Sequence, residues 1–288
     1  MLLLAVPNVS EGRDPGAIAA IGGAYTRGGA ARLLDTHADP DHHRAVHTLA
    51  GEPARLATAL AQGAQEAIAS IDLRADRGLH PHVGALDVAP VVHLDAARRG
   101  AACAEALLAG ELLGELGLPV LLYGALAQGR SRAELRRGGI ARLAQRLAAG
   151  ELRPDFGPPR AHPSAGAVLV GARPPLIAFN VELEPPATPE DARRIAAELR
   201  EGGEHGLPGL RAIGLELAAR AGVVQVSMNV EDHERLPLAE VVAAIVSRAR
   251  VRVCEQVGLA PESAYAGFPD DVPVRGRRTV EQALHDLD

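Results

Sequence analysis

The sequence contains no lysine, so all 30 of its basic side chains are arginines. This absence excludes Schiff-base chemistry and a P-loop, because both depend on a lysine side chain. The two cysteines, Cys103 and Cys254, form no CxxC pair. We therefore expect neither a disulfide framework nor a cysteine zinc site, and we predict a cytoplasmic protein. No apolar run reaches the roughly 18 residues that a membrane span requires.

Aromatic residues are also scarce, with three Phe, three Tyr and no Trp. The formal net charge is -6, which gives no electrostatic reason to expect nucleic acid or an anionic membrane as partner. The arginine clusters at 136–137 and 275–278 are not interleaved with aromatic residues. We interpret both clusters as solvated surface charge and expect small-molecule partners instead.

The predicted elements place two similar units in the chain. Over the first 94 residues the order is strand, helix, strand, strand, helix, strand, which is the split βαβ or ferredoxin-like unit. Asp14 followed by Pro15 predicts the start of the first helix, because the pair suits an N-cap and a first helical position. The predicted strands cover 2–6, 32–35, 43–49 and 88–94, and the predicted helices cover 14–25 and 53–71.

Residues 96–149 are predicted to add a helix, a strand and a helix over 132–149, before a proline-rich stretch. We predict an N-terminal subdomain over 1–152, a linker over 153–166 and a C-terminal subdomain over 167–288. In the second half, Thr188 caps one helix, a longer helix covers 237–253, and an edge strand lies near 263–266. The fold class is therefore α+β, with two ferredoxin-like subdomains whose helices cover sheets of four or more strands, and a ligand crevice between them.

The segment 78–90 brings together two imidazoles, a carboxylate, two glycines and two prolines. This composition excludes a helix, and the segment leads directly into a predicted strand, so we expect a loop at the mouth of a sheet. Histidine titrates nearest to neutral pH, so His80 or His82 could take up and return a proton within one reaction. A hydrogen-bonded structural histidine is the alternative reading of either residue.

Further imidazoles and carboxylates precede this loop. His80 and His82 form a His-x-His pair that a metal could use, with Asp39 or His37 completing the site. No HExxH motif is present, and Asp-Pro-Asp-His is also ordinary turn chemistry, so we expect no metal. The cluster consists of Asp35, His37, Asp39, Asp41, His42, His43, His47, His80, His82 and Asp87.

Arginines supply the groups that could hold an anionic ligand. Arg44 follows a polar stretch, Arg160 lies in the proline-rich segment, and Arg173 comes shortly after it. A guanidinium binds a carboxylate through two parallel hydrogen bonds, so these residues are candidate carboxylate ligands. A solvated surface arginine is the alternative for each of them.

Several short motifs follow one another along the chain. They are VPNVSEG at 6–12, HP at 80–81 with GALDV at 84–88, DFGP at 155–158 with PS at 163–164, GAR at 171–173 with LIAFN at 176–180, and QVSMN at 225–229. Together these motifs resemble the glutamate formiminotransferase family, in its stand-alone form without the cyclodeaminase domain. The resemblance implies transfer of a formimino group from N-formimino-L-glutamate to N5 of tetrahydrofolate, in histidine degradation. It also implies two ferredoxin-like subdomains with the folate between them, and a homodimer.

The resemblance also implies roles for individual residues. His80 of the His-Pro pair is the implied catalytic residue. Substrate contacts are assigned to His37, His43, Arg44 and His82, and the folate-binding segment falls on Gly157, Pro158, Arg160, His162, Pro163, Ser164, Ala165 and Gly166. The chain departs from the family pattern at Leu79, His82, His43, His37 and Ala165.

The chemistry of this reaction suits a single imidazole. The incoming N5 must lose a proton and the departing glutamate nitrogen must gain one, and one group near pKa 7 can do both in turn. The amidinium is cationic, so Asp39 or Asp87 could hold it and tune His80. Two alternatives stay open, namely a metal-dependent hydrolase of an amidine or amide bond and a folate-type binding paralogue without transferase activity.

Overall fold

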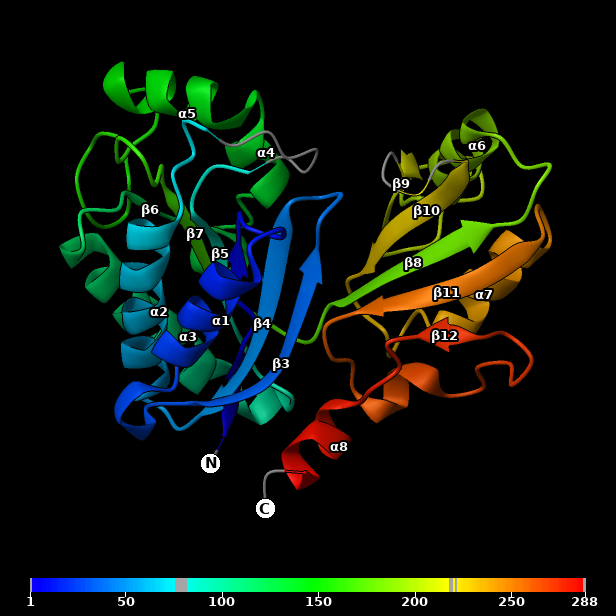
Figure 1. Cartoon of the computed structure of the whole chain (residues 1–288), viewed down its shortest axis with the longest axis horizontal. Helices are drawn as coiled ribbons and strands as arrows, with labels where there is room; N and C mark the ends of the chain where they lie inside the picture. Colours follow the sequence, from blue (N-terminus) through cyan, green and yellow to red (C-terminus); the bar gives the residue numbers. More distant parts are fainter. Residues whose placement is uncertain (1, 76–81, 218–219, 221, 287–288) are drawn as a thin grey trace. The chain divides into compact units, whose positions relative to one another are not determined.

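The computed structural model describes residues 2–75, 82–217, 220 and 222–286 (Figure 1). The chain forms two compact units, Met1–Pro174 and Pro175–Asp288. Their described residues build one sheet of seven strands and one sheet of five. Each sheet has its own cluster of buried apolar side chains against its helices. The α+β class predicted from the order of the elements is confirmed.

The first unit begins with the predicted ferredoxin-like order. β1 and β2 lie in line as one interrupted strand, and both pair antiparallel with β4 and β5, while β3 pairs with the outer side of β4. The sequence-order strands of the βαββαβ unit thus lie in the spatial order 4-1-3-2. The elements are β1 (Leu3–Ala5), β2 (Asn8–Val9), α1 (Pro15–Ala24), β3 (Arg32–Asp39), β4 (Arg44–Gly51), α2 (Leu56–Ser70) and β5 (Leu86–Val92).

This sheet is then extended by two parallel strands. β7 pairs with both β5 and β6, and helices cover both faces of this part of the sheet. The helix predicted over 132–149 is two helices, because Gly138 takes a left-handed backbone (φ 83) between them. The elements are α3 (Arg99–Glu115), β6 (Val120–Leu122), α4 (Arg132–Arg136), α5 (Gly139–Ala148) and β7 (Val168–Arg173), with short 3-10 helices at Arg27–Gly29, Ala96–Arg98 and Gly124–Leu126.

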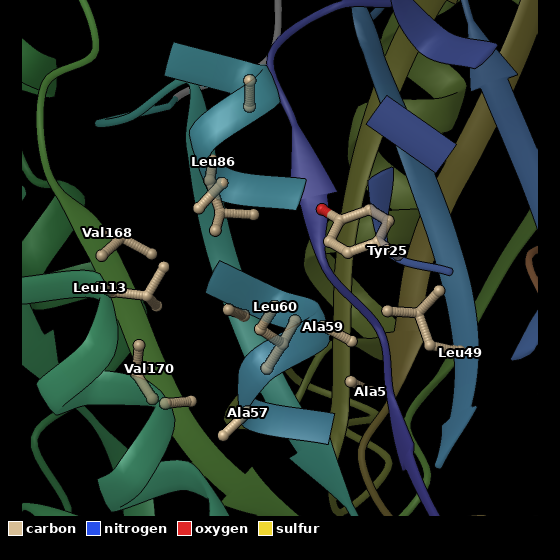
Figure 2. Packing of buried hydrophobic residues seen from close by; sticks show 14 of the residues in the cluster. Ala5, Tyr25, Leu49, Ala57, Ala59, Leu60, Leu86, Leu113, Val168 and Val170 are labelled. Atoms are coloured by element: carbon tan, nitrogen blue, oxygen red, sulfur yellow. The ribbon is translucent and has the colours of Figure 1, made fainter. Parts of the chain in front are cut away.

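The core of the first unit lies between its sheet and the helices α1, α2 and α3 (Figure 2). Tyr25 at the end of α1 is fully buried, and burial raises the pKa of its hydroxyl well above the usual range. Its ring packs so closely on α2 that a side chain at Gly63 would overlap it. Leu60 of α2 and Leu113 of α3 complete the packing against Val168 and the neighbouring strands. This close packing fixes the strands that carry the polar residues described below.

The second unit repeats the same strand order on its own sheet. β8 lies between β11 and β10, β9 forms one edge, and β12 adds a short parallel strand at the other. Phe179, Val226 and Ile195 lie in its core. The elements are β8 (Ile177–Leu183), α6 (Pro189–Leu199), β9 (Leu210–Leu217), β10 (Val223–Val230), α7 (Leu238–Val246), β11 (Val251–Val257), a 3-10 helix (Glu262–Tyr265), β12 (Val274–Arg275) and α8 (Val280–His285).

Two predictions for the second half are wrong. The helix predicted over 237–253 ends at Val246, and Val251–Val257 is a strand that carries the buried Cys254. Pairing with β8 decides this stretch, because its alternating β-branched residues fit a pleated surface better than a helix. The edge strand predicted near 263–266 is instead largely the 3-10 helix that precedes β12.

The boundary between the compact units also differs from the predicted linker. β7, which the prediction assigned to the C-terminal subdomain, pairs with β5 and β6 of the first unit. The stretch 153–166 is also tied to the first unit, since the amide of Val120 donates to Phe156 O at 2.9 Å and the amide of Leu73 donates to Ser164 O at 2.9 Å. The prolines of this stretch thus marked an irregular segment of the first unit. The boundary between the units falls between Pro174 and Pro175.

Candidate functional site

A small polar pocket lies within the first unit, where β2, β4 and β5 come together. Its cavity volume is about 10 Å³, close to the room that one water molecule takes. Val9 of β2, Ala45 of β4 and Leu86 of β5 belong to the core beneath α1 and α2. Their neighbours point to the opposite side of the sheet, because side chains alternate along a strand. The pocket is lined by Asn8, Val9, Ser10, His42, His43, Arg44, His82 and Asp87.

The segment after β2 is held closely against its neighbours. The Ser10 amide donates to Ala85 O at 2.9 Å, and its hydroxyl donates to Gly84 O at 2.8 Å. Gly12 lies so near the turn between β3 and β4 that a Cβ atom there would overlap the backbone of Asp39 and Arg44. The VPNVSEG motif therefore places polar residues at the pocket and ends on a glycine that this close approach requires.

Asp39 organises the turn between β3 and β4. One carboxylate oxygen accepts hydrogen bonds from the amides of Asp41 (2.9 Å) and His42 (3.0 Å), and the other lies 2.6 Å from His42 Nδ1. Burial opposes ionisation of Asp39, but the His42 contacts and the charge of Arg44 outweigh it and hold the pKa well below its usual range. Asp39 is therefore ionised, with both oxygens engaged in the turn.

Asp87 is positioned by an irregularity in β5. Asn8 pairs with Val88 and Val9 with Leu86, so Asp87 is the extra residue of a bulge, a device that commonly re-aims a side chain at a site. Its Oδ1 accepts a hydrogen bond from the amide of Val83 at 2.8 Å. Its Oδ2 accepts a short hydrogen bond from Nη2 of Arg136 on α4.

This ion pair corrects the interpretation of Arg136 as solvated surface charge. The side chain of Arg136 is only 17% exposed and that of Asp87 only 4%, whereas the adjacent Arg137 is exposed. The sequence offered little to separate the two arginines. Leu135 is buried on the same short helix, but the orientation of α4 over the sheet decides which arginine reaches Asp87.

Arg44 opens β4 and pairs in register with Asp39 on β3. Its Nε is buried and has no hydrogen-bond partner among the described residues. Burial lowers the pKa of Arg44, the carboxylate of Asp39 raises it, and the charge of Arg136 lowers it again. A guanidinium remains protonated under such shifts, so Arg44 presents a positive charge at the pocket.

The predicted catalytic residue, His80, lies outside the described residues, as does Leu79. His82 follows two positions later and lines the pocket. His43 takes a left-handed backbone (φ 50), and its Nδ1 accepts a hydrogen bond from the Gly12 amide at 3.2 Å. The structure therefore brings His43, Arg44, His82 and Asp87 together.

Two other histidines of the first half lie away from this group. His37 is partly exposed on β3 opposite Val46, outside the pocket lining. His47 is fully buried, with Nδ1 3.1 Å from the Thr36 hydroxyl and its ring 5.4 Å from that of Tyr25. Burial lowers the pKa of His47 to about 4. His47 is thus a neutral core histidine at ordinary pH.

The predicted folate-binding segment makes two turns along the first unit. Gly157 takes a left-handed backbone (φ 77), and a Cβ there would overlap Leu118 O. His162 Nδ1 accepts a hydrogen bond from the Ala165 amide at 3.0 Å, while His162 and Gly166 exchange backbone hydrogen bonds. The backbone therefore depends on His162, and the side chain of Ala165 is buried in the core.

The remaining side chains of this segment differ in exposure. Arg160 and Pro163 are exposed, whereas Pro158 and Ser164 are partly buried. Arg173, at the end of β7, donates through Nη1 to Pro174 O at 3.0 Å and is not part of the pocket lining. Folate binding by 157–166 stays a prediction.

Two further properties of the described residues bear on other functions. Within 2–75, 82–217, 220 and 222–286, no three or more His, Cys, Asp or Glu side chains are grouped as a metal site would need. The predicted His80–His82 pair lies partly outside that range. None of the helices described is both long and apolar enough to cross a membrane.

The pocket lies in a region that matches a known family. A family model described as "Formiminotransferase domain, N-terminal subdomain" matches residues 2–173, and a second, "Formiminotransferase domain", matches 178–266. The chain belongs to the formiminotransferase family. The family predicted from the motifs is confirmed. The boundary between the two compact units falls between the two matched ranges.

Individual relatives agree with this membership. The chain is 34% identical to a glutamate formimidoyltransferase of Streptococcus pyogenes serotype M1 over 268 residues, covering 90% of the chain and 89% of the relative. A glutamate formimidoyltransferase of Thermoplasma acidophilum is also 34% identical, over 91% of the chain and 89% of the relative. A formimidoyltransferase-cyclodeaminase of Rattus norvegicus is 39% identical over 246 residues. The chain spans about half the length of such cyclodeaminase relatives, 44% in this case.

Proposed function

We propose that this one-carbon transferase moves a formimino group from N-formimino-L-glutamate to N5 of tetrahydrofolate, a reaction of histidine degradation. The observation that carries the proposal is the family membership over nearly the whole chain, together with a polar pocket to which the family motifs contribute Asn8, Ser10 and Asp87. Tetrahydrofolate is the co-substrate, and the chemistry requires no metal. We further propose that the protein works in the cytoplasm as a homodimer.

His80 carries the proton transfers in this proposal. N5 attacks the formimino carbon, and His80 accepts the proton that N5 loses. The same imidazolium then donates a proton to the departing glutamate nitrogen as the C–N bond breaks. His82 lines the pocket and follows His80 by two positions in the sequence, which supports the assignment of His80 to this site.

The neighbouring residues bind and position the substrates. Arg44 presents a cation for a carboxylate. Asp87 contributes a negative charge that favours the protonated form of a nearby imidazole. The turn at Asp39 holds His43 and Arg44 at the pocket rim, so Asp39 supports the site through its position. The segment 157–166 binds the folate.

The test is formimino transfer to tetrahydrofolate, followed by the absorbance of the folate product. Parent protein and the variants His80→Ala, His82→Ala and His205→Ala are compared, His205 being an exposed histidine of the second unit. We expect His80→Ala to lose turnover by about 100-fold or more, the usual contribution of general acid–base catalysis. His82→Ala and His205→Ala should retain turnover.

Calorimetric binding of tetrahydrofolate separates the alternatives. Parent protein that binds folate without transferring the group would contradict the transferase proposal and favour a binding paralogue. Hydrolysis of the formimino donor that depends on added metal and on both His80 and His82 would favour a metal-dependent hydrolase. Equal turnover by the parent and His80→Ala would remove His80 as the catalytic residue.

A further inference from the structure

Arg44 and Asp87 line the pocket, and two arginines of α4 lie close enough to act on Arg44. Arg136 of α4 is paired with Asp87 of β5. Arg44 of β4 interacts electrostatically with Arg136, with Asp87 and also with Arg132, which begins α4. The charges of both α4 arginines lower the pKa of Arg44. This proximity of like charges calls for a counter-charge.

The oxygens of both nearby carboxylates are already engaged. Asp39 uses its two oxygens within its own turn, and Asp87 divides its oxygens between the Val83 amide and Arg136. Arg44, Arg132 and Arg136 carry three positive charges, and the carboxylates that act on Arg44 are those of Asp39 and Asp87. An anionic ligand would add a negative charge beside these arginines.

The unused hydrogen-bond donors point to the same ligand. A guanidinium carries five N–H donors in a planar fork. The Nε atoms of Arg44 and Arg136 are both buried without a hydrogen-bond partner among the described residues. Buried donors of this kind are normally satisfied, by protein or by ligand. A planar carboxylate matches the guanidinium fork in both shape and charge.

We infer that Arg136 and Arg44 together bind a carboxylate of a glutamate moiety, and that Asp87 positions Arg136 for this contact. The nature of the ligand rests on the proposed function, since both proposed substrates contain glutamate. N-formimino-L-glutamate is one source of the carboxylate, and the glutamate tail of tetrahydrofolate is the other. Arg136 is thereby a specificity residue supplied by an element outside the ferredoxin-like repeat.

The experiment compares Arg136→Gln with Arg137→Gln, an exposed neighbour at the end of the same helix. Calorimetry on the full chain measures binding of L-glutamate, N-formimino-L-glutamate, tetrahydrofolate and tetrahydropteroate, which lacks the glutamate tail. We expect Arg136→Gln to weaken at least one glutamate-containing ligand by about tenfold or more, the loss of a charge-assisted contact. Arg137→Gln should bind every ligand as the parent does.

The two sources give different patterns. Weakened binding of N-formimino-L-glutamate alone assigns the subsite to the donor, and weakened tetrahydrofolate with unchanged tetrahydropteroate assigns it to the folate tail. Arg136→Lys keeps a positive charge beside Asp87 but lacks the planar guanidinium fork. It should bind the glutamate-containing ligand more weakly than the parent and more tightly than Arg136→Gln. That order distinguishes a ligand contact from loss of folding.

Other outcomes would overturn the inference. Equal affinities of Arg136→Gln and Arg137→Gln for every ligand would do so, and so would equal weakening of tetrahydrofolate and tetrahydropteroate. Parent protein that binds glutamate through Arg136 but transfers no formimino group would overturn the proposed function alone. Parent protein that transfers the group, with Michaelis constants that Arg136→Gln leaves unchanged, would overturn this inference alone.

Discussion

The two units share one strand order, but they use their charged residues differently. In the second unit, Glu182 of β8 accepts hydrogen bonds from Arg220 (2.6 Å) and Arg275 (3.1 Å), and Arg275 also reaches Glu255 at 3.2 Å. In the first unit, Arg44 and Arg136 retain buried donors without partners among the described residues. Ion pairs that satisfy one another are explained by the protein alone, whereas the buried guanidinium donors beside the pocket leave room for an anionic partner.

The units also differ in what is added to the common repeat. Among the described residues, the second unit gains the short strand β12 and the helix α8, whereas the first gains the strands β6 and β7 and the helices α3, α4 and α5. The added helix α4 carries Arg136, and the bulge in β5 turns Asp87 towards it. The same strand order thus carries different additions in the two units, and the additions to the first unit supply Arg136 beside the polar pocket.

The largest expected effect concerns the stability of the first unit in acid. Unfolded His47 binds a proton near its ordinary pKa of 6.5, whereas folded His47 binds one only near 4. Between these values the unfolded state holds more protons, so the free energy of unfolding falls as the pH falls from 6.5 to 4. The loss from this group amounts to about 3 kcal/mol.

Urea unfolding at several pH values checks this expectation. His47→Leu removes the titrating group, so its free energy of unfolding should depend less on pH between 4 and 6.5 than that of the parent. An unchanged pH dependence in His47→Leu would show that other groups cause the acid sensitivity. An NMR titration of the parent should place the midpoint of His47 near 4.

A pair of glycine substitutions sharpens the contrast between a site and a core. A Cβ at Gly12 would overlap the backbone of Asp39 and Arg44, and one at Gly214 would overlap the backbone of α6. Each change to Ala should lower the free energy of unfolding by about 2 kcal/mol, measured by urea unfolding. Gly12→Ala should also weaken glutamate binding measured by calorimetry, whereas folded Gly214→Ala should bind normally. Normal binding by Gly12→Ala would contradict its placement at the site.

A smaller effect is expected from exchanging an arginine for a lysine in each unit. Arg44→Lys keeps the charge but loses the planar fork, so kcat/KM for formimino transfer should fall by about tenfold. Arg211→Lys is the matched change on β9, where the exposed Arg211 pairs with Glu201 (2.9 Å) and Glu231 (3.3 Å). Steady-state kinetics should show little change for it. Equal losses of kcat/KM in Arg44→Lys and Arg211→Lys would contradict the different roles given to the arginines of the two units.

The smallest effects come from the helix caps that the two units share. Asp14 accepts hydrogen bonds from the amides of Gly16 and Ala17, and Thr188 accepts one from Asp191. Asp14→Ala and Thr188→Ala should each lower the free energy of unfolding by about 1 kcal/mol. Urea unfolding should show this loss. Calorimetry should show an unchanged affinity for glutamate in both variants, since neither residue lines the pocket. A loss of affinity in either variant would show that the caps hold the site.

Local sequence signals predicted some elements well and others badly. The pairs at 14–15 and 188–189 placed the starts of α1 and α6 correctly, because a capping side chain followed by proline acts within one turn. The helix predicted over 237–253 failed at its end, because the alternating Val251 and Val253 suit a strand once a partner strand is present. Strand β11 forms because β8 is there to pair with it.

The residues of the pocket were likewise predicted from the sequence only in part. The residues predicted for the site include His43, Arg44, His82 and Asp87, which line the pocket, and also His37, which lies outside its lining. Asn8 and Ser10 belong to the VPNVSEG motif but were not predicted as site residues. Arg136 was misjudged because its partner lies 49 residues away in the sequence.

The order of residues alone was sufficient for the α+β class, the duplicated strand order and the family, because caps, periodicity and short motifs are properties of neighbouring residues. The pairing of Arg136 with Asp87, the close approach at Gly12 and the burial of His47 required the folded chain. These features depend on distances between segments remote in sequence. Such distances are set when helices pack on a sheet, and they decide which charged groups are left for a ligand.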